Sequence, residues 1–286
     1  MLHLSPGTQP SVQVEALFLA AEAGFTGQRF CLYHPPQGRV VQGLILYVHP
    51  FAEEMNKSRR MAALQSRAFA RSGYGVLQID LFGCGDSSGD FGDASWSVWI
   101  DDIVHGAAWL ATRAAAPLWL WGLRAGCLLA ANAARRLDVP CNFLFWHPPV
   151  AGKLLLQQFL RLKVAAEMLS GASAGAMGVL RSQLAGGTSV DIAGYTLSSD
   201  LAAGLEQGTL LPPPTGGPGR RLEWIELSSQ ADAPHLAPAS QRTVDAWREA
   251  GCTVRSQVVS GPAFWQTAEI EEAPLLVAAT LEALGG

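Results

Sequence analysis

Short apolar segments alternate with longer helical patterns along most of this 286-residue chain. Several of these segments carry almost no polar residues, which is typical of parallel strands buried on both faces of a sheet. The first two follow one another without a helix between them, so we expect the sheet to start with an antiparallel pair. The predicted strands are residues 16–20, 29–34, 43–49, 75–80, 118–122, 143–147, 222–227 and 254–259.

Helical patterns follow most of the strands, at residues 57–72, 96–112, 125–137, 238–250 and 274–284. This order predicts an α/β fold with a mostly parallel, doubly wound sheet of about eight strands, in which ligands bind at the carboxyl ends of the strands. Hydrophobic residues make up 49% of the chain and charged residues only 15%, so a chain of this length can bury a full core.

One stretch, between residues 150 and 221, interrupts this alternation. It is helical in pattern and rich in Ala and Gly, and it contains a Pro/Gly run at residues 212–219 that suits a connector. Because it falls between the sixth and seventh predicted strands, we predict a helical lid (residues 150–221) inserted into an α/β core domain (residues 1–149 and 222–286). Residues 154–160 form an amphipathic pattern, whose apolar face is expected either to cover a ligand site or to pack on the core.

The pentapeptide Gly122-Leu123-Arg124-Ala125-Gly126 lies between a predicted strand and a predicted helix. A Gly-x-Ser-x-Gly sequence in that place forms a nucleophile elbow, a sharp turn whose small flanking residues let the central side chain project into an active site. Here the central residue is Arg124, which stays protonated and cannot attack a carbonyl. The sequence therefore predicts the turn of a hydrolase without its nucleophile.

These features together resemble the α/β-hydrolase superfamily over nearly the whole chain: the order of elements, the elbow, the Asp80–Ser87 turn and His49-Pro50-Phe51. More narrowly, residues 49–60, the elbow and Gly261-Pro262-Ala263-Phe264-Trp265 resemble the exosortase A system-associated hydrolases, the second of two types. That resemblance implies an α/β-hydrolase fold and a bacterial setting near exopolysaccharide biosynthesis and PEP-CTERM protein sorting. It does not supply a reaction.

Acyl hydrolysis on this fold needs a nucleophile, a histidine base, an orienting acid and an oxyanion hole. The base is expected after the last strand, but that loop carries Phe264 and Trp265 where a histidine would stand. Asp232 suits the acid position, and His235 lies in the same loop as Asp232 rather than in the base loop. With an arginine at the elbow and an aromatic pair in the base loop, we do not expect Ser-His-Asp chemistry.

Three other nucleophilic side chains lie close to these motifs. Cys127 falls in the first turn of the helix after the elbow, where a thiol pKa is lowered, but two leucines follow it and favour a buried structural thiol. Cys84 and Ser87 belong to the Asp80–Ser87 turn, in which glycines permit the backbone conformation. We therefore expect all three to be structural.

Arg124 is expected at the amino end of a helix, where the unsatisfied N–H groups already carry partial positive charge. A buried charge without a partner is strongly destabilising, so something negative must meet it. Glu53 and Glu54 follow the loop that would build the oxyanion hole, and we expect one of them to pair with Arg124; Asp232 is the third candidate. A carboxylate so placed could also run general acid/base chemistry without a covalent intermediate.

Two readings of this site stay open. An arginine beside helix N–H groups can receive an anionic ligand, with Phe51 and Trp265 as an apolar wall and Asn56 orienting hydroxyl groups. Alternatively, the arginine and its carboxylate are an ion pair that fills a dead site. His49 is open in the same way, since it can donate to a ligand or brace the oxyanion loop.

Two functions follow. The first is an enzyme that acts on an acyl or glycosyl compound by an altered mechanism. The second is a catalytically silent hydrolase relative that binds an anionic ligand or a protein partner through Arg124. A small-molecule ligand, acyl or saccharide, is expected in either case. A homodimer through the lid is compatible with the sequence, which has no feature that establishes one.

Other classes of function are disfavoured by composition. The net charge of −4 argues against nucleic-acid binding, and five scattered cysteines without a C-x-x-C pair argue against a metal site or a disulfide framework. We therefore expect no metal and no cofactor. The first residues carry neither a basic nor an apolar leader pattern, and no run is long enough to span a membrane, so we expect a cytoplasmic protein.

Overall fold

The structure is a computed structural model that describes residues 13–20, 26–169, 175–213, 219–230 and 235–285. One sheet holds eight strands in the order β1-β2-β4-β3-β5-β6-β9-β10. β1 pairs antiparallel with β2, which pairs antiparallel with β4, and every other pairing in this sheet is parallel. All eight predicted strands and their antiparallel start are confirmed. The strands are β1 Glu15–Leu19, β2 Arg29–His34, β3 Gly43–Val48, β4 Tyr74–Ile79, β5 Leu118–Leu123, β6 Cys141–Trp146, β9 Arg221–Ser228 and β10 Thr253–Ser260.

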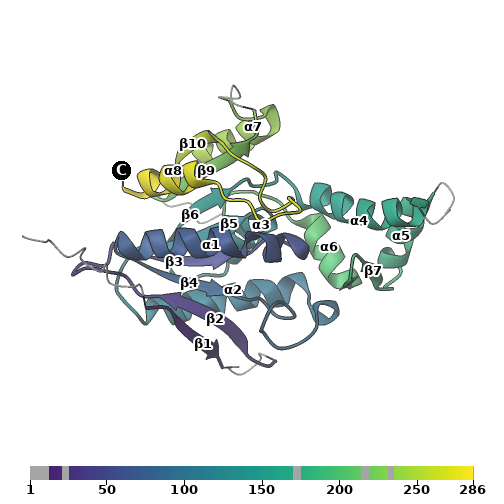
Figure 1. Ribbon diagram of the computed structural model, residues 1–286, viewed down its shortest axis with the longest axis horizontal. Helices are drawn as coiled ribbons and strands as arrows, with labels where there is room; N and C mark the ends of the chain where they lie inside the picture. Colours follow the sequence, from purple (N-terminus) through teal and green to yellow (C-terminus); the bar gives the residue numbers. More distant parts are fainter. Residues whose placement is uncertain (1–12, 21–25, 170–174, 214–218, 231–234, 286) are drawn as a thin grey trace, which may run out of the picture.

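Helices cover both faces of the sheet (Figure 1). Apolar residues of α2, α3 and α7 share one core cluster with the sheet, and apolar residues of α8 and of α1 beyond its first turn share the other. The five predicted helices are all present, as α1 Glu53–Arg71, α2 Trp96–Ala111, α3 Ala125–Ala133, α7 Pro238–Glu249 and α8 Pro274–Gly285.

α1 begins four residues earlier than predicted, at Glu53 instead of residue 57. The chain turns directly from β3 into this helix through Ala52, whose φ is 50° and ψ −127°. Glu53 and Glu54 therefore lie in the first helical turn, where a carboxylate is favoured by the helix dipole, and not in a free loop.

A helical insertion lies between β6 and β9, and Figure 1 shows its helices α4 and α5 extending away from the sheet. α4 buries Leu155, Leu156, Phe159 and Leu160, the apolar face that the sequence predicted. The insertion also holds a small β-hairpin, closed by Ala193 and Gly194 at φ 49° and 86°, that was not among the predicted elements. An alanine seldom adopts that conformation, so the turn has no typical sequence signal. The elements are α4 Gly152–Leu169, α5 Ala176–Ala185, β7 Val190–Ile192, β8 Tyr195–Leu197 and α6 Ser199–Gln207.

No helix in the described parts of the chain is long and apolar enough to cross a bilayer. The exact limits of the two expected domains, 1–149 with 222–286 and 150–221, stay a prediction.

The turn between β5 and α3 has the geometry of an elbow. Arg124 precedes α3 with φ 54° and ψ −119°, a backbone conformation that residues other than glycine rarely adopt. A Cβ atom on Gly122 would lie 2.5 Å from the Cys127 nitrogen, and one on Gly126 would lie 2.1 Å from the Val48 oxygen. The two glycines thus let α3 approach β3 and β5 closely, while residue 124 is thrust outward from the turn.

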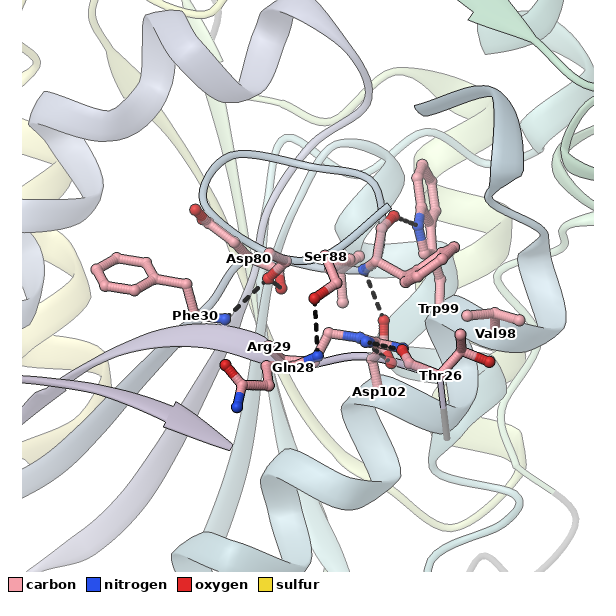
Figure 2. A network of polar contacts seen from close by, with 12 residues as sticks. Thr26, Gln28, Arg29, Phe30, Asp80, Ser88, Val98, Trp99 and Asp102 are labelled. Carbon is pink, nitrogen blue, oxygen red and sulfur yellow. Dashed lines mark hydrogen bonds and ion pairs between the residues drawn. The ribbon is translucent and has the colours of Figure 1, made fainter. Parts of the chain in front are cut away.

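A buried ion pair fixes the other side of the carboxyl edge. Figure 2 shows Arg29 of β2 reaching Asp102 of α2, with 2.6 Å between Nε and Oδ1. The second carboxylate oxygen accepts a hydrogen bond from the Phe82 backbone N–H at 2.7 Å, and the Trp99 indole donates to the Phe82 carbonyl at 2.9 Å. These contacts hold β2, α2 and the loop after β4 together. Trp99 in turn packs against Phe51, so the network supports the ligand end of the sheet.

Substitution of Gly126 tests the packing of the elbow. Gly126→Ala should lower the free energy of unfolding by at least about 2 kcal/mol, because the added methyl group meets the Val48 carbonyl. Gly178→Ala is the matched control, since Gly178 is also helical and a Cβ there meets nothing within 4 Å. It should stabilise the protein by about 0.5–1 kcal/mol. Urea denaturation of both variants measures the difference, and equal effects would contradict the close approach.

The buried pair gives a second test. Burial raises the pKa of Asp102 to about 6, against the opposing effects of the Phe82 N–H and Arg29, so the carboxylate is ionised at pH 8. Asp102→Asn should then destabilise the protein by about 3–5 kcal/mol at pH 8, because Arg29 keeps an uncompensated buried charge. The neighbouring Asp101→Asn removes the half-exposed partner of the exposed Arg136 and should cost less than about 1 kcal/mol. Similar losses in both variants would show that Arg29 does not depend on its partner.

Candidate functional site

A cavity of about 480 Å³ lies between the start of α1, the helix α4 and the loop after β10. Its walls are mostly apolar. Leu155 and Phe159 are four residues apart and thus share the face of α4 that closes the cavity. The lining residues are Phe51, Ala52, Glu53, Glu54, Lys57, Leu155, Gln158, Phe159, Leu162, Trp265 and Gln266.

Arg124 lies beneath this cavity and is only 6% exposed. Its Nε and Nη2 atoms donate to the same oxygen of Glu54, at 3.3 and 3.2 Å, and Nη2 also donates to Gln158 Oε1 at 3.0 Å. The guanidinium carbon sits 5.6 Å from the ring centre of Trp265. All three residues that hold the guanidinium line the cavity, whereas Arg124 itself does not. They separate its charge from any ligand above.

The expected partner of Arg124 is thus present, and it is Glu54 rather than Glu53. The pair is not a bidentate fork, since both guanidinium donors converge on Oε1. The other oxygen, Oε2, is buried without a hydrogen-bond partner. Burial raises the pKa of Glu54 above its ordinary value, although the charge and hydrogen bonds of Arg124 act in the opposite direction. Glu54 is therefore a partly satisfied carboxylate, ready to accept one further hydrogen bond.

An aromatic loop occupies the position where the resemblance placed the base. Phe264 and Trp265 are buried, and Trp265 packs against His147 with 4.7 Å between ring centres. The Leu227 N–H donates to His147 Nδ1 at 3.2 Å, so the imidazole is protonated on Nε2 when neutral. Burial, with a smaller effect of Arg124, lowers the pKa of His147 to about 4. Sequence reasoning did not single out His147, which follows β6 with φ 44°.

The other expected ligand residues occupy different surroundings. His49 is buried outside the cavity lining, donating from Nδ1 to the Pro50 carbonyl (2.8 Å) and accepting the Leu81 N–H at Nε2 (3.3 Å). This arrangement matches the bracing alternative. Phe51 lines the cavity and contacts Phe159 of the insertion edge to face, with 5.1 Å between the ring centres.

Glu53 and Asn56 meet the insertion at the cavity rim. Tyr195 donates to Glu53 Oε2 at 2.9 Å, and Asn56 Nδ2 is 3.3 Å from that oxygen and 3.2 Å from the tyrosine hydroxyl. Asn56 does not line the cavity, so its amide is placed to hold the hairpin against α1.

The remaining candidates lie away from the cavity or outside the described residues. Asp232 belongs to residues that the structure does not describe, and His235 is exposed. Cys84 and Cys127 are buried, and burial raises the pKa of each thiol above its ordinary value. Ser87 accepts the Phe30 N–H at 2.9 Å and donates to the Asp80 carbonyl at 2.5 Å, as a structural residue would.

The described lining of the cavity consists mainly of apolar, amide and charged side chains. Of the described residues that line the cavity, none is a serine, a cysteine or a histidine. Within the described ranges no three His, Cys, Asp or Glu residues are grouped so that they could hold a metal ion. The polar chemistry of the cavity comes from Glu53, Glu54, Lys57 and two glutamines, and the rest of its surface is suited to apolar groups.

No protein-family model and no curated protein matches the sequence of this chain. Similar folds are found among solved structures. Est1E from Butyrivibrio proteoclasticus with bound ferulic acid has a TM-score of 0.64 at 14% identity, over 95% of this chain and all of the other. A thermostable carboxyl esterase from Bacillus coagulans in complex with glycerol has a TM-score of 0.63 at 12% identity, over 95% and 97% of the two chains.

A soluble variant of monoglyceride lipase from Saccharomyces cerevisiae, in complex with a substrate analog, has a TM-score of 0.60 at 13% identity, over 99% and 97% of the two chains. Identities this low establish only a common architecture. The eight-stranded, mostly parallel sheet, the elbow after β5 and the helical insertion after β6 all agree with it. This chain has the α/β-hydrolase fold.

Proposed function

We propose that this protein is a catalytically silent relative of α/β-hydrolases that binds a small amphipathic molecule in the cavity above Arg124. One observation carries the proposal: the elbow position holds a guanidinium that is neutralised by Glu54, capped by Gln158 and stacked near Trp265. A permanently charged group so enclosed cannot act as a nucleophile, and the indole of Trp265 cannot act as a base.

The walls of the cavity favour an acyl or similarly apolar chain, for which Phe51, Phe159 and Leu162 supply contact surface. Lys57 offers a polar contact to a hydroxyl-bearing head group. A small organic ligand agrees with the ferulic acid and the substrate analog bound to two of the structures with this fold. The resemblance of residues 49–60 and 261–265 to exosortase A system-associated hydrolases supports a lipid-linked or saccharide-linked ligand near exopolysaccharide synthesis.

Binding of an anion through Arg124 is a weaker form of this proposal. Glu54 already answers the positive charge, and both Glu54 and Gln158 stand between the guanidinium and the cavity. The burial of Arg124 also favours a small ligand over a protein partner, because a protein surface could not reach the guanidinium.

A second candidate, hydrolysis by an altered mechanism, is favoured by Glu54 alone. A carboxylate with a raised pKa in the lining of the cavity can take a proton from a water molecule bound there, as a general base does. Such an enzyme would turn over its substrate, unlike the silent binder, and would form no covalent intermediate, unlike an ordinary esterase.

Activity probes distinguish the three. We expect no fluorophosphonate labelling and no turnover of p-nitrophenyl butyrate, while the neutral amphiphile monocaprin raises the melting temperature. Turnover without labelling that disappears in Glu54→Gln would instead establish the altered mechanism. Labelling of a serine or cysteine would contradict the loss of the nucleophile.

A charge substitution tests the neutralised floor of the cavity. Glu54→Gln should free the Arg124 guanidinium, so decanesulfonate, which stays ionised, should bind at least about tenfold more tightly, a change of about 1.4 kcal/mol. Glu53→Gln is the matched control, because Glu53 bonds to Tyr195 and not to Arg124, and it should leave this affinity within about twofold. Isothermal titration calorimetry of both variants, with monocaprin as the neutral comparison, measures the change.

The same carboxylate predicts a pH dependence in the wild-type protein. Because burial raises the pKa of Glu54, acidification from neutral pH protonates it earlier than an exposed glutamate and removes its negative charge from Arg124. Decanesulfonate affinity should therefore rise as the pH falls, and this rise should be absent in Glu54→Gln. A pH-independent affinity in the wild-type protein would show that Glu54 does not control access to the guanidinium.

A further inference from the structure

The outer face of α4 is unusually apolar for a surface helix. Leu154, Leu162 and Met168 are 49%, 52% and 62% exposed, and no other helix in the described chain carries more than one exposed large apolar residue. Leu154 and Met168 are fourteen residues apart, two heptads, so they lie on nearly the same line along the helix. That line runs for about 21 Å. It is opposite the face that buries Leu155 and Phe159, so packing within the molecule does not account for it.

Basic residues accompany this apolar line. Arg161 lies midway between Leu154 and Met168 on the same side of the helix, and Lys153 lies beside Leu154. The one acidic residue of α4, Glu167, is 3.8 Å from Lys163 and is thereby neutralised. In a protein with a net charge of −4, α4 carries three basic residues and one acidic residue. The outward face therefore combines apolar and positive side chains without a carboxylate.

All three lysines of the chain are gathered at this end of the molecule. Lys153 and Lys163 lie on α4, and Lys57 lines the cavity that α4 closes. Leu162 connects the two features, because it lines the cavity and is also half exposed on the outside. In Figure 1 α4 runs along the upper edge of the insertion, between the core and α5.

An apolar face rimmed by basic residues matches an anionic lipid surface. Leucine and methionine side chains enter the boundary between head groups and acyl chains, while lysine and arginine contact lipid phosphates. A second copy of this chain fits less well, because a twofold axis at the centre of the line would bring Arg161 against its own counterpart. A helix with a buried inner face lies on a membrane and does not cross it.

We propose that α4 docks this protein on anionic membranes, with Leu154, Leu162 and Met168 inserted at the interface and Arg161 and Lys153 on the head groups. Leu162, which lines the cavity and is half exposed, then lies at the edge of the docked surface. Docking does not depend on the proposed function, because it uses the outer face of α4 and not the floor of the cavity around Arg124.

Vesicle co-sedimentation tests the docking surface. The full chain should bind vesicles of phosphatidylcholine that contain about 30 mol% of the anionic lipid phosphatidylglycerol. It should bind vesicles of phosphatidylcholine alone at least about tenfold more weakly. The double variant Leu154→Asp/Met168→Asp should lose at least tenfold in partitioning. Arg161→Gln should lose about fivefold and reduce the salt dependence.

Val40→Asp is the matched control, because Val40 is 65% exposed in the loop before β3, at the opposite end of the strands from the cavity. It should leave vesicle binding unchanged. Far-ultraviolet circular dichroism establishes that each variant is folded, and every substituted side chain in the double variant is already exposed. Absence of binding to the anionic vesicles, or equal losses in the control and the double variant, would overturn the proposal.

Two further measurements distinguish membrane docking from ligand binding in the cavity and from dimerisation through α4. Glu54→Gln, which alters the cavity floor, should keep full vesicle binding, so a failure of the ligand proposal leaves the docking result intact. Sedimentation velocity should show the same oligomeric state for the wild-type protein and the double variant. A wild-type dimer that dissociates in the double variant would assign the face to a second copy and refute membrane docking.

Discussion

The site is organised around one buried positive charge. Arg124 sits in the sharp turn at the amino end of α3, and it needs a carboxylate that the same fold must provide. Glu54 supplies it because the turn at Ala52 places the first turn of α1 directly over the elbow. Gln158 adds a bond from α4, so the core and the insertion meet at this guanidinium. The shape and polarity of the cavity both follow from this closure.

Much of the framework could be predicted from the sequence, because apolar runs and glycine spacing are local signals. The eight strands, the elbow and an Arg124–glutamate pair were all accessible in this way. The start of α1 was not, since residues 53–56 carry no helical periodicity and the unusual φ of Ala52 leaves no trace in residue type. The capping by Gln158 was also inaccessible, because it depends on how α4 packs across a long separation in sequence.

The two polar centres of the carboxyl edge have different consequences for the molecule. The Arg29–Asp102 pair joins β2, α2 and the loop after β4, and it is connected to the cavity lining through Trp99, which packs against Phe51. The Arg124–Glu54 pair forms part of the cavity floor. The contacts that stabilise this edge of the fold are therefore separate from the contacts that shape the ligand cavity. Substitutions in the cavity floor can change which ligand binds while the framework is retained.

The backbone at Ala52 nearly repeats that at Arg124, with φ of 50° and 54° and ψ of −127° and −119°. Neighbouring strands β3 and β5 thus each turn abruptly into a helix at the same edge. The amino ends of α1 and α3 converge there, and their partial charges add to the charge of the guanidinium. The carboxylates of Glu53 and Glu54, both in the first turn of α1, offset these positive sources, so the balance of charge at this edge shifts when Glu54 alone is neutralised.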